Sequence, residues 1–152
     1  MDSIPPKKRY LVLCTGNRCR SQMAHGYLAH LGGDAVEVRS AGTKPKGVHP
    51  LAIEVMQEVG IDISGHTSDH VDAYRDKPFD CVITVCDHAK EACPVFPGAA
   101  RTLHQGFEDP DDEQFAQQDP EAFAQRFRRI RDEIGAWAEG FLADEGVRTS
   151  AQ

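Results

Sequence analysis

The sequence predicts a single three-layer α/β/α domain, in which helices cover both faces of a four-stranded parallel sheet. Short apolar segments typical of buried strands alternate with amphipathic segments typical of helices, which is the usual pattern of such sheets. The 152 residues suit one domain, expected to span 1–152 with its core over about 9–142. A composition of 40% hydrophobic and 27% charged residues is ordinary for a globular protein.

The first half of the chain supplies two strands and two helices. Residues 9–14 and 35–42 are the predicted strands. Between them, 21–33 carries apolar side chains at helical spacing and ends at two glycines. A second helix is predicted over 49–60, because Pro50 suits the first turn of a helix and a glycine closes the segment.

The second half supplies two more strands and a long helix. Residues 79–86 form a nearly continuous apolar run, and 101–107 are a candidate fourth strand. Asp119 and Pro120 then open the long helix. Its apolar side chains recur at intervals of four and three and form a single stripe, made of Phe123, Phe127, Ile130, Ile134, Trp137 and Phe141.

Charge and hydropathy exclude several classes of protein. A formal net charge of −7 argues against nucleic acid as the main partner. No apolar run approaches the roughly 18 residues of a membrane-spanning helix, so no membrane association is expected. The apolar run near the N-terminus has only five residues, too few for a signal peptide. We therefore expect a cytoplasmic protein.

The cysteines do not suit a structural role as a group. There are five of them, namely Cys14, Cys19, Cys81, Cys86 and Cys93. An odd number in a reducing compartment argues against permanent disulfides. Their spacing matches no structural zinc template, even with His88 and His104 added, so no metal site is expected. What remains is a mixture of inert and reactive cysteines, with Cys81 expected to be a buried small hydrophobe in mid-strand.

The segment "CTGNRCRS", from Cys14 to Ser21, joins a predicted strand to a predicted helix. It therefore lies at the carboxyl end of a parallel strand, where open α/β sheets bind ligands. Such a turn directs backbone N–H groups and the positive end of a helix dipole at one point. We expect an oxyanion to bind there, to Thr15, Gly16, Asn17, Arg18, Cys19 and Arg20.

Individual roles follow from this position. The local field favours the thiolate of Cys14, a candidate nucleophile. Arg20 can grip two oxygens of a tetrahedral oxyanion, and Ser21 can donate a hydrogen bond to the thiolate. Arg18 is expected to supply general positive potential, and Cys19 to be non-essential but open to stray oxidation. The alternative is a buried structural Cys14 beside two surface arginines.

The pattern Cys-x-Gly-Asn-x-Cys-Arg-Ser resembles the signature loop of the low-molecular-weight protein tyrosine phosphatase superfamily. Within it, "CTGNRCRSQMA" (14–24) is similar to the cysteine-triad arsenate reductases coupled to thioredoxin. "SAGT" (40–43), "ITVCDHAKEACPVFPG" (83–98) and "GFEDP" (106–110) agree in the same order, and the similarity extends over about 9–140. The resemblance implies a phosphatase-like fold and the reduction of arsenate to arsenite for arsenic detoxification, without a cofactor.

The resemblance also implies catalytic roles. Cys14 attacks arsenate, Cys86 attacks the adduct and releases arsenite, and Cys93 then forms a disulfide with Cys86. Asp109 is the general acid, although from the residues alone a solvated carboxylate in an acidic loop fits it better. Seven helical residues advance about 10.5 Å, whereas bridged cysteines need Cα atoms within about 7 Å. We therefore expect 87–92 to be helical when reduced and to unwind when oxidised.

The implied partners are small molecules and a redox protein. Arsenate is the substrate, phosphate competes with it, and thioredoxin is the electron donor, with glutaredoxin and glutathione as alternatives. The chain is expected to be a monomer. The alternative function is a protein tyrosine phosphatase, and a weak phosphatase side activity fits either reading. Asp111 and Asp112 argue against that alternative, because they follow the Asp-Pro where such phosphatases usually place aromatic residues.

Some of these reductases bind potassium beside the catalytic loop through Asn, Glu, Ser and Asp oxygens. Asn17, Ser40 and Asp69 occupy matching positions, but the position of the Glu is taken by His25. Imidazole is a poor ligand for an ion that prefers oxygen. We therefore expect no activation by potassium.

Overall fold

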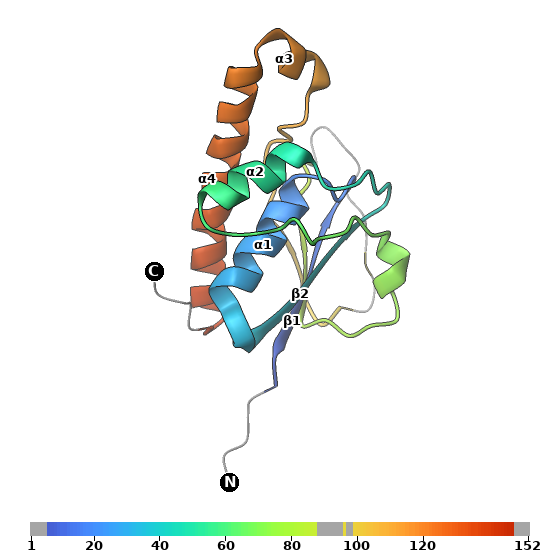
Figure 1. Ribbon diagram of the computed structural model, residues 1–152. Coiled ribbons are helices and arrows are strands. Elements are labelled where there is room, and N and C mark those ends of the chain that lie inside the picture. Colours follow the sequence, from blue (N-terminus) through green and yellow to red (C-terminus); the bar gives the residue numbers. More distant parts are fainter. Residues whose placement is uncertain (1–5, 88–95, 97–98, 148–152) are drawn as a thin grey trace.

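Figure 1 shows the computed structural model, which describes residues 6–87, 96 and 99–147. The elements in chain order are β1 (Lys8–Cys14), α1 (Arg20–Gly32), η1 (Gly33–Ala35), β2 (Val36–Gly42), α2 (Pro50–Glu58), η2 (Val71–Tyr74), β3 (Cys81–Thr84), β4 (Thr102–His104), α3 (Glu113–Gln118) and α4 (Pro120–Asp144). The four strands form one parallel sheet in the order β2-β1-β3-β4. The predicted α/β class and the four-stranded parallel sheet are confirmed.

The register of the sheet gathers the ends of the strands at one edge. β1 lies at the centre, where Cys14 is paired with Gly42 of β2 and Leu13 with Thr84 of β3. Because all four strands are parallel, the segments that follow them leave the sheet on the same side. The loop after Cys14 therefore lies next to the loops that follow the other strands.

Helices α1, α2 and α4 cover one face of the sheet (Figure 1). Tyr10 and Val12 point into this layer from β1, and Phe127 and Ile134 fill it from α4, all four with no exposed surface. Full burial of one such apolar side chain contributes about 1.5–3 kcal/mol. The core on this face reaches Val147, beyond the predicted end at about 142.

The opposite face is covered more thinly. Leu11 and Leu13 alternate with the residues of the first face, as strand geometry requires, and they pack with Val71, Phe79 and Phe96. Among the described residues, this layer consists of the short helix η2 and loop segments. Within the described residues, the only helical turn in this layer is the 3₁₀ helix η2.

Differences from the predicted elements lie at their ends. β3 begins at Cys81 and ends at Thr84, so it is shorter than the predicted 79–86 strand, although the Val85 N–H still donates to the Leu13 oxygen at 2.9 Å. α3 was not predicted; the Asp112 carboxylate caps its N-terminus. The prediction that 87–92 is helical when reduced and unwinds when oxidised concerns a segment that, apart from Asp87, lies outside the described residues. Within the described part of the chain, no helix is both long and apolar enough to cross a membrane.

Candidate active site

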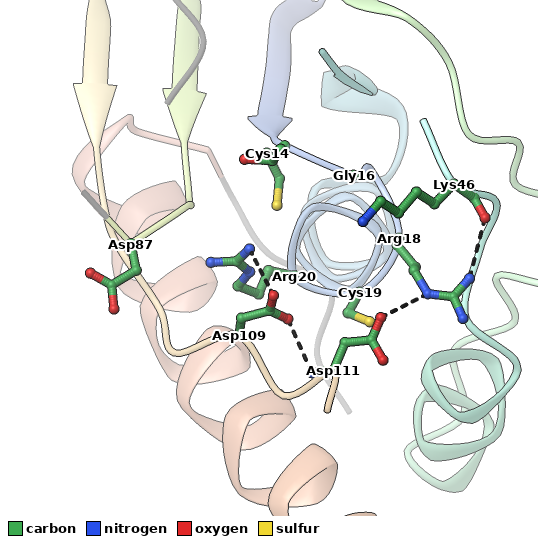
Figure 2. Close-up of a pocket in the computed structure, with 10 residues that line it drawn as sticks. Cys14, Gly16, Arg18, Cys19, Arg20, Lys46, Asp87, Asp109 and Asp111 are labelled. Atoms are coloured by element: carbon green, nitrogen blue, oxygen red, sulfur yellow. Dashed lines mark hydrogen bonds and ion pairs between the residues drawn. The ribbon is translucent and has the colours of Figure 1, made fainter. Parts of the chain in front are cut away.

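A cavity of about 270 Å³ opens at the carboxyl edge of the sheet (Figure 2). This volume lies below the roughly 300–1,000 Å³ usual for drug-sized ligands, so the cavity suits a small ion. The loop after β1 and the segments after the other three strands form its wall. The lining residues are Cys14, Thr15, Gly16, Arg18, Cys19, Arg20, Lys46, Asp87, Asp109 and Asp111.

The loop between β1 and α1 turns its carbonyl groups away from this cavity. The oxygens of Thr15, Gly16, Arg18 and Cys19 accept backbone hydrogen bonds of 2.9–3.0 Å from Lys44, Lys46, His49 and Met23, respectively. The Asn17 oxygen accepts one of 2.9 Å from the Ser68 hydroxyl. In a trans peptide the carbonyl and the next N–H point in opposite directions. The N–H groups of 16–20 are therefore turned inward, in an arrangement that binds anions.

Asn17 fixes the shape of the loop. It has a positive φ of 46°, a region that Asn tolerates better than most residues, and it is fully buried. Its side-chain oxygen accepts a hydrogen bond from the Asp69 N–H at 2.9 Å, and its amide donates to the Ser21 hydroxyl at 2.8 Å. Because the Ser21 oxygen is the acceptor in that bond, its own proton is left for another partner.

Gly42 is required by the close approach of β2 to the loop. A Cβ atom at this position would lie 2.5 Å from the Thr15 oxygen and 2.8 Å from the Cys14 oxygen. Both are backbone atoms, so neither can rotate away. The glycine of the "SAGT" segment therefore allows the loop to rest directly against β2.

Arg20 and Asp109 lie next to each other in the wall of the cavity and form an ion pair (Figure 2). Arg20 is 3% exposed and donates from Nη1 to the Phe107 carbonyl at 3.2 Å, while its Nη2 lies 3.6 Å from Asp109 Oδ2. The other carboxylate oxygen of Asp109 accepts a hydrogen bond from the Asp111 N–H at 3.0 Å. The half-exposed carboxylate is thus held at the mouth of the cavity, within reach of an ion bound to Arg20.

Cys14 and Cys86 lie at the carboxyl ends of two neighbouring strands, Cys14 as the last residue of β1 and Cys86 two residues after β3. Cys14 points its Sγ toward the space bordered by Arg20 (Figure 2). Cys86 follows β3, is fully buried and is disulfide-bonded, whereas Cys14, Cys19 and Cys81 are thiols. Cys93 lies outside the described residues. Sheet pairing brings the two strand ends together, so Cys86 lies on the side of the cavity marked by its neighbour Asp87.

The surroundings of Cys19 and Arg18 are more specific than the sequence predicts. Cys19 is 3% exposed, and burial, followed by the Asp111 and Asp109 carboxylates, raises its pKa well above the ordinary value. Both effects favour the thiol form, which is less easily oxidised than a thiolate, and the oxidation expected of Cys19 stays a prediction. Arg18 makes a specific ion pair, with its Nε 2.9 Å from Asp111 Oδ2, where only general positive potential was expected. Cys81 is fully buried, as predicted.

The residues that match a potassium site do not fit that ion. The Ser40 hydroxyl is hydrogen-bonded to His25 Nδ1 at 2.9 Å, and the Asp69 carboxylate accepts from the Thr67 and Tyr74 hydroxyls. Burial, followed by the nearby His66, lowers the pKa of His25 to about 3. A neutral ring stacked on His66, with 4.1 Å between the ring centres, thus occupies this place.

Sequence reasoning missed several residues of the site. Lys46 and Asp87 line the cavity without an assigned role, and His49 lies beside Asp111 with its Nε2 3.6 Å from Oδ1. Position alone could have indicated Asp87, because it follows the predicted strand that ends at Cys86. The others come from loops whose paths the sequence pattern does not determine.

Comparisons with known proteins identify the family of this chain. The low molecular weight phosphotyrosine protein phosphatase family matches residues 9–151. An arsenate reductase of Halalkalibacterium halodurans is 45% identical over 129 residues, which cover 85% of this chain and 91% of that protein.

Solved structures agree as well. An arsenate reductase in the phosphate-binding state has a TM-score of 0.74 and 35% identity, and the match covers 90% of this chain and 98% of that one. A thioredoxin-dependent arsenate reductase of Corynebacterium glutamicum has a TM-score of 0.56 and 34% identity, over 85% of this chain and 62% of that one. This chain therefore belongs to the low-molecular-weight phosphotyrosine protein phosphatase family and, within it, to the arsenate reductases.

Proposed function

We propose that this chain reduces arsenate to arsenite for arsenic detoxification, through a relay of three cysteines with thioredoxin as the final electron donor. One observation carries the proposal. The Cys14 thiol lies in a small cavity with inward-facing amides and a buried Arg20, at the same sheet edge as Cys86. An oxyanion site with a second redox-active sulfur beside it suits oxyanion reduction better than simple hydrolysis.

The first step is an ester-forming displacement. The loop amides and Arg20 hold the arsenate oxygens, and the Cys14 thiolate attacks arsenic. One arsenic–oxygen bond breaks as the sulfur–arsenic bond forms. Asp109 gives its proton to the departing oxygen, which leaves as water. Ser21, whose oxygen is occupied by Asn17, supplies a hydrogen bond to the sulfur.

The next steps carry the oxidation away from arsenic. The Cys86 thiolate attacks the Cys14 sulfur, a disulfide forms, and the sulfur–arsenic electron pair stays on arsenic, which leaves as trivalent arsenite. Cys93 then attacks Cys86, which releases Cys14 as a thiolate and leaves a Cys86–Cys93 disulfide. Both are thiol exchanges favoured by a thiolate within reach. The disulfide-bonded Cys86 beside a Cys14 thiol matches the oxidised end of this relay.

The donor and the competitor follow from the relatives. One similar structure is that of a thioredoxin-dependent enzyme, and another holds an arsenate reductase in the phosphate-binding state. We infer that thioredoxin reduces the final disulfide here and that phosphate competes for the cavity. The relay needs reduced thiols between turnovers, which suits the cytoplasm.

A tyrosine phosphatase is the second candidate, because the family as a whole is named for that activity. Two features of the cavity disfavour it. Its lining contains no aromatic side chain among the described residues, and Asp111 follows the Asp-Pro at its rim. A carboxylate at that place repels an anionic phosphopeptide. We therefore expect only weak hydrolysis of aryl phosphates.

Turnover of arsenate with the purified thioredoxin system tests the proposal. The wild type should release arsenite, whereas Cys14→Ser, Cys86→Ser and Cys93→Ser should each lose sustained turnover. Cys86→Ser and Cys93→Ser should keep aryl phosphate hydrolysis, since that reaction needs only Cys14. Cys81→Ala is the matched control, because this buried thiol lies at the opposite end of β3 and should leave turnover intact. Full arsenite production by Cys86→Ser would overturn the relay.

A further inference from the structure

We propose that Asp111 is a positioning residue that holds the acid loop over the cavity by bridging Arg18 and His49. The inference rests on the proposed role of Asp109 as general acid. It concerns a residue that does not touch the reacting atoms itself and that acts through its neighbour Asp109. The connection among the four residues is made by contacts on three separate segments of the chain.

The first contact joins the acid loop to the catalytic loop. Arg18 Nε donates to Asp111 Oδ2 at 2.9 Å. The same guanidinium donates from Nη1 to the carbonyl oxygens of Lys46 and Gly47, at 3.2 and 3.3 Å. Arg18 is therefore anchored to the segment after β2 as well as to its own loop. The Arg18 side chain is therefore held in place where it binds the Asp111 carboxylate (Figure 2).

The second contact is made by His49 at the start of α2. Its Nδ1 accepts a hydrogen bond from the Leu51 N–H at 3.0 Å and so caps the helix. Burial lowers the pKa of His49, which keeps the ring neutral at neutral pH. A neutral ring whose Nδ1 is an acceptor carries its proton on Nε2. That N–H faces Asp111 Oδ1, with 3.6 Å between the heavy atoms.

The third contact links Asp111 to Asp109, the proposed general acid. The backbone N–H of Asp111 donates to Asp109 Oδ1 at 3.0 Å, while Asp109 Oδ2 lies 3.6 Å from Arg20 Nη2. The Asp111 side chain thus fixes the peptide that orients the Asp109 carboxyl group. Without this bridge, the peptide of Asp111 would be less fixed, and its hydrogen bond would orient the Asp109 carboxylate less well.

A purely structural role would give a different pattern. The Arg18–Asp111 pair is partly exposed, and such pairs contribute little to the stability of a fold. Loss of the bridge should therefore leave unfolding nearly unchanged and act on the chemical step. General acids contribute about 10²–10⁴-fold to rates, so partial misplacement of Asp109 should cost roughly tenfold.

The test compares Asp111→Asn with Asp112→Asn. Asp112 carries the same charge in the same loop, and Asn keeps its cap on α3, so it is the matched control. In a single turnover, Asp111→Asn should form the arsenic adduct roughly tenfold more slowly, with arsenate affinity changed less than about threefold. Arg18→Gln should slow adduct formation in the same way, and because it also removes a positive charge from the cavity lining, it should weaken arsenate binding as well. Added to Asp109→Asn, Asp111→Asn should cost nothing further, because the acid it positions is already absent.

A second readout separates this inference from the proposed function. Aryl phosphates need Cys14 and the acid but no arsenic, so Asp111→Asn should slow phenyl phosphate more than p-nitrophenyl phosphate, whose leaving group needs less proton donation. The amide at position 111 should also exchange its hydrogen faster in Asp111→Asn and Arg18→Gln than in Asp112→Asn. Equal losses for both esters, additive losses in the double variant, or unchanged amide exchange would each overturn the bridge.

Discussion

Replacement of Gly42 by alanine tests whether β2 supports the catalytic loop. The new Cβ atom would lie 2.5 Å from the Thr15 oxygen and 2.8 Å from the Cys14 oxygen. An ordinary contact begins near 3.4 Å, so the Thr15 oxygen must move by about 3.4 − 2.5 = 0.9 Å. Overpacking of this kind costs about 1–3 kcal/mol in the free energy of unfolding.

The substitution should lower activity as well as stability. A displacement of about 1 Å at a reacting group can cost roughly 10²-fold in rate, and the atoms that must shift belong to Cys14 and its neighbour. We therefore expect Gly42→Ala to fold but to reduce arsenate about 100-fold more slowly. It should also lose most of the stabilisation by phosphate, which at 100 times Kd is worth about 2.7 kcal/mol in a protein that binds it.

Urea unfolding with and without phosphate, together with arsenate turnover, measures both effects. Gly140→Ala is the control, because a Cβ there meets nothing within 4 Å. Alanine in that exposed turn of α4 should raise the free energy of unfolding by up to about 1 kcal/mol without changing turnover. Wild-type stability and turnover in Gly42→Ala would refute the close support of the loop by β2.

Three further predictions concern charge and ions. Lys46→Ala should raise KM for arsenate roughly fivefold at low salt, as expected for the loss of about 1 kcal/mol from a solvated charge, and the rise should shrink at high salt. Lys44 lies outside the cavity lining, so Lys44→Ala is the control, and an equal rise in KM there would contradict a specific role of Lys46. The pKa of His25 falls from 6.5 to about 3 on folding, so the unfolded chain takes up a proton that the folded chain refuses as the pH drops below 6.5. The contribution of His25 to the free energy of unfolding is therefore fully present above pH 6.5 and is lost toward pH 3, with a slope of up to about 1.4 kcal/mol per pH unit. Urea unfolding of His25→Gln at several pH values should show a flatter slope, and an unchanged slope would contradict the buried neutral ring. Potassium in place of sodium should change neither the melting temperature nor turnover, and a several-fold rise in rate would show that Asn17, Ser40 and Asp69 do hold the ion.

Local sequence patterns determine the central part of the fold. The apolar run that ends at Cys14 and the helix from Arg20 were predictable within a residue or two, because strand and helix periodicities are local properties. The start of α4 was equally predictable: Asp119 accepts from the Ala122 N–H, and Pro120 occupies the first turn. The loop from Thr15 to Cys19 lies between β1 and α1, as predicted, and its binding of an oxyanion stays a prediction.

The parts that could not be predicted depend on distant segments. Asn17 is held by the N–H of Asp69, 52 positions away in the chain, and Arg18 by a carboxylate 93 positions away. No periodicity reports such pairs, since they arise only when loops meet at one sheet edge. α3 was missed for a different reason, because a helix of six residues has too few turns to show an apolar stripe.

A donor-free single turnover tests the three-cysteine relay most directly. The fully reduced chain, in which all five cysteines are thiols, is mixed with excess arsenate. Released arsenite and remaining thiols are then counted, and peptide mapping shows which cysteines are bridged and whether Cys14 is still a thiol. One arsenite should appear for every two thiols lost, the new disulfide should join Cys86 to Cys93, and Cys14 should still react with alkylating agent. Five titratable thiols and no trivalent arsenic after the reaction would contradict the account.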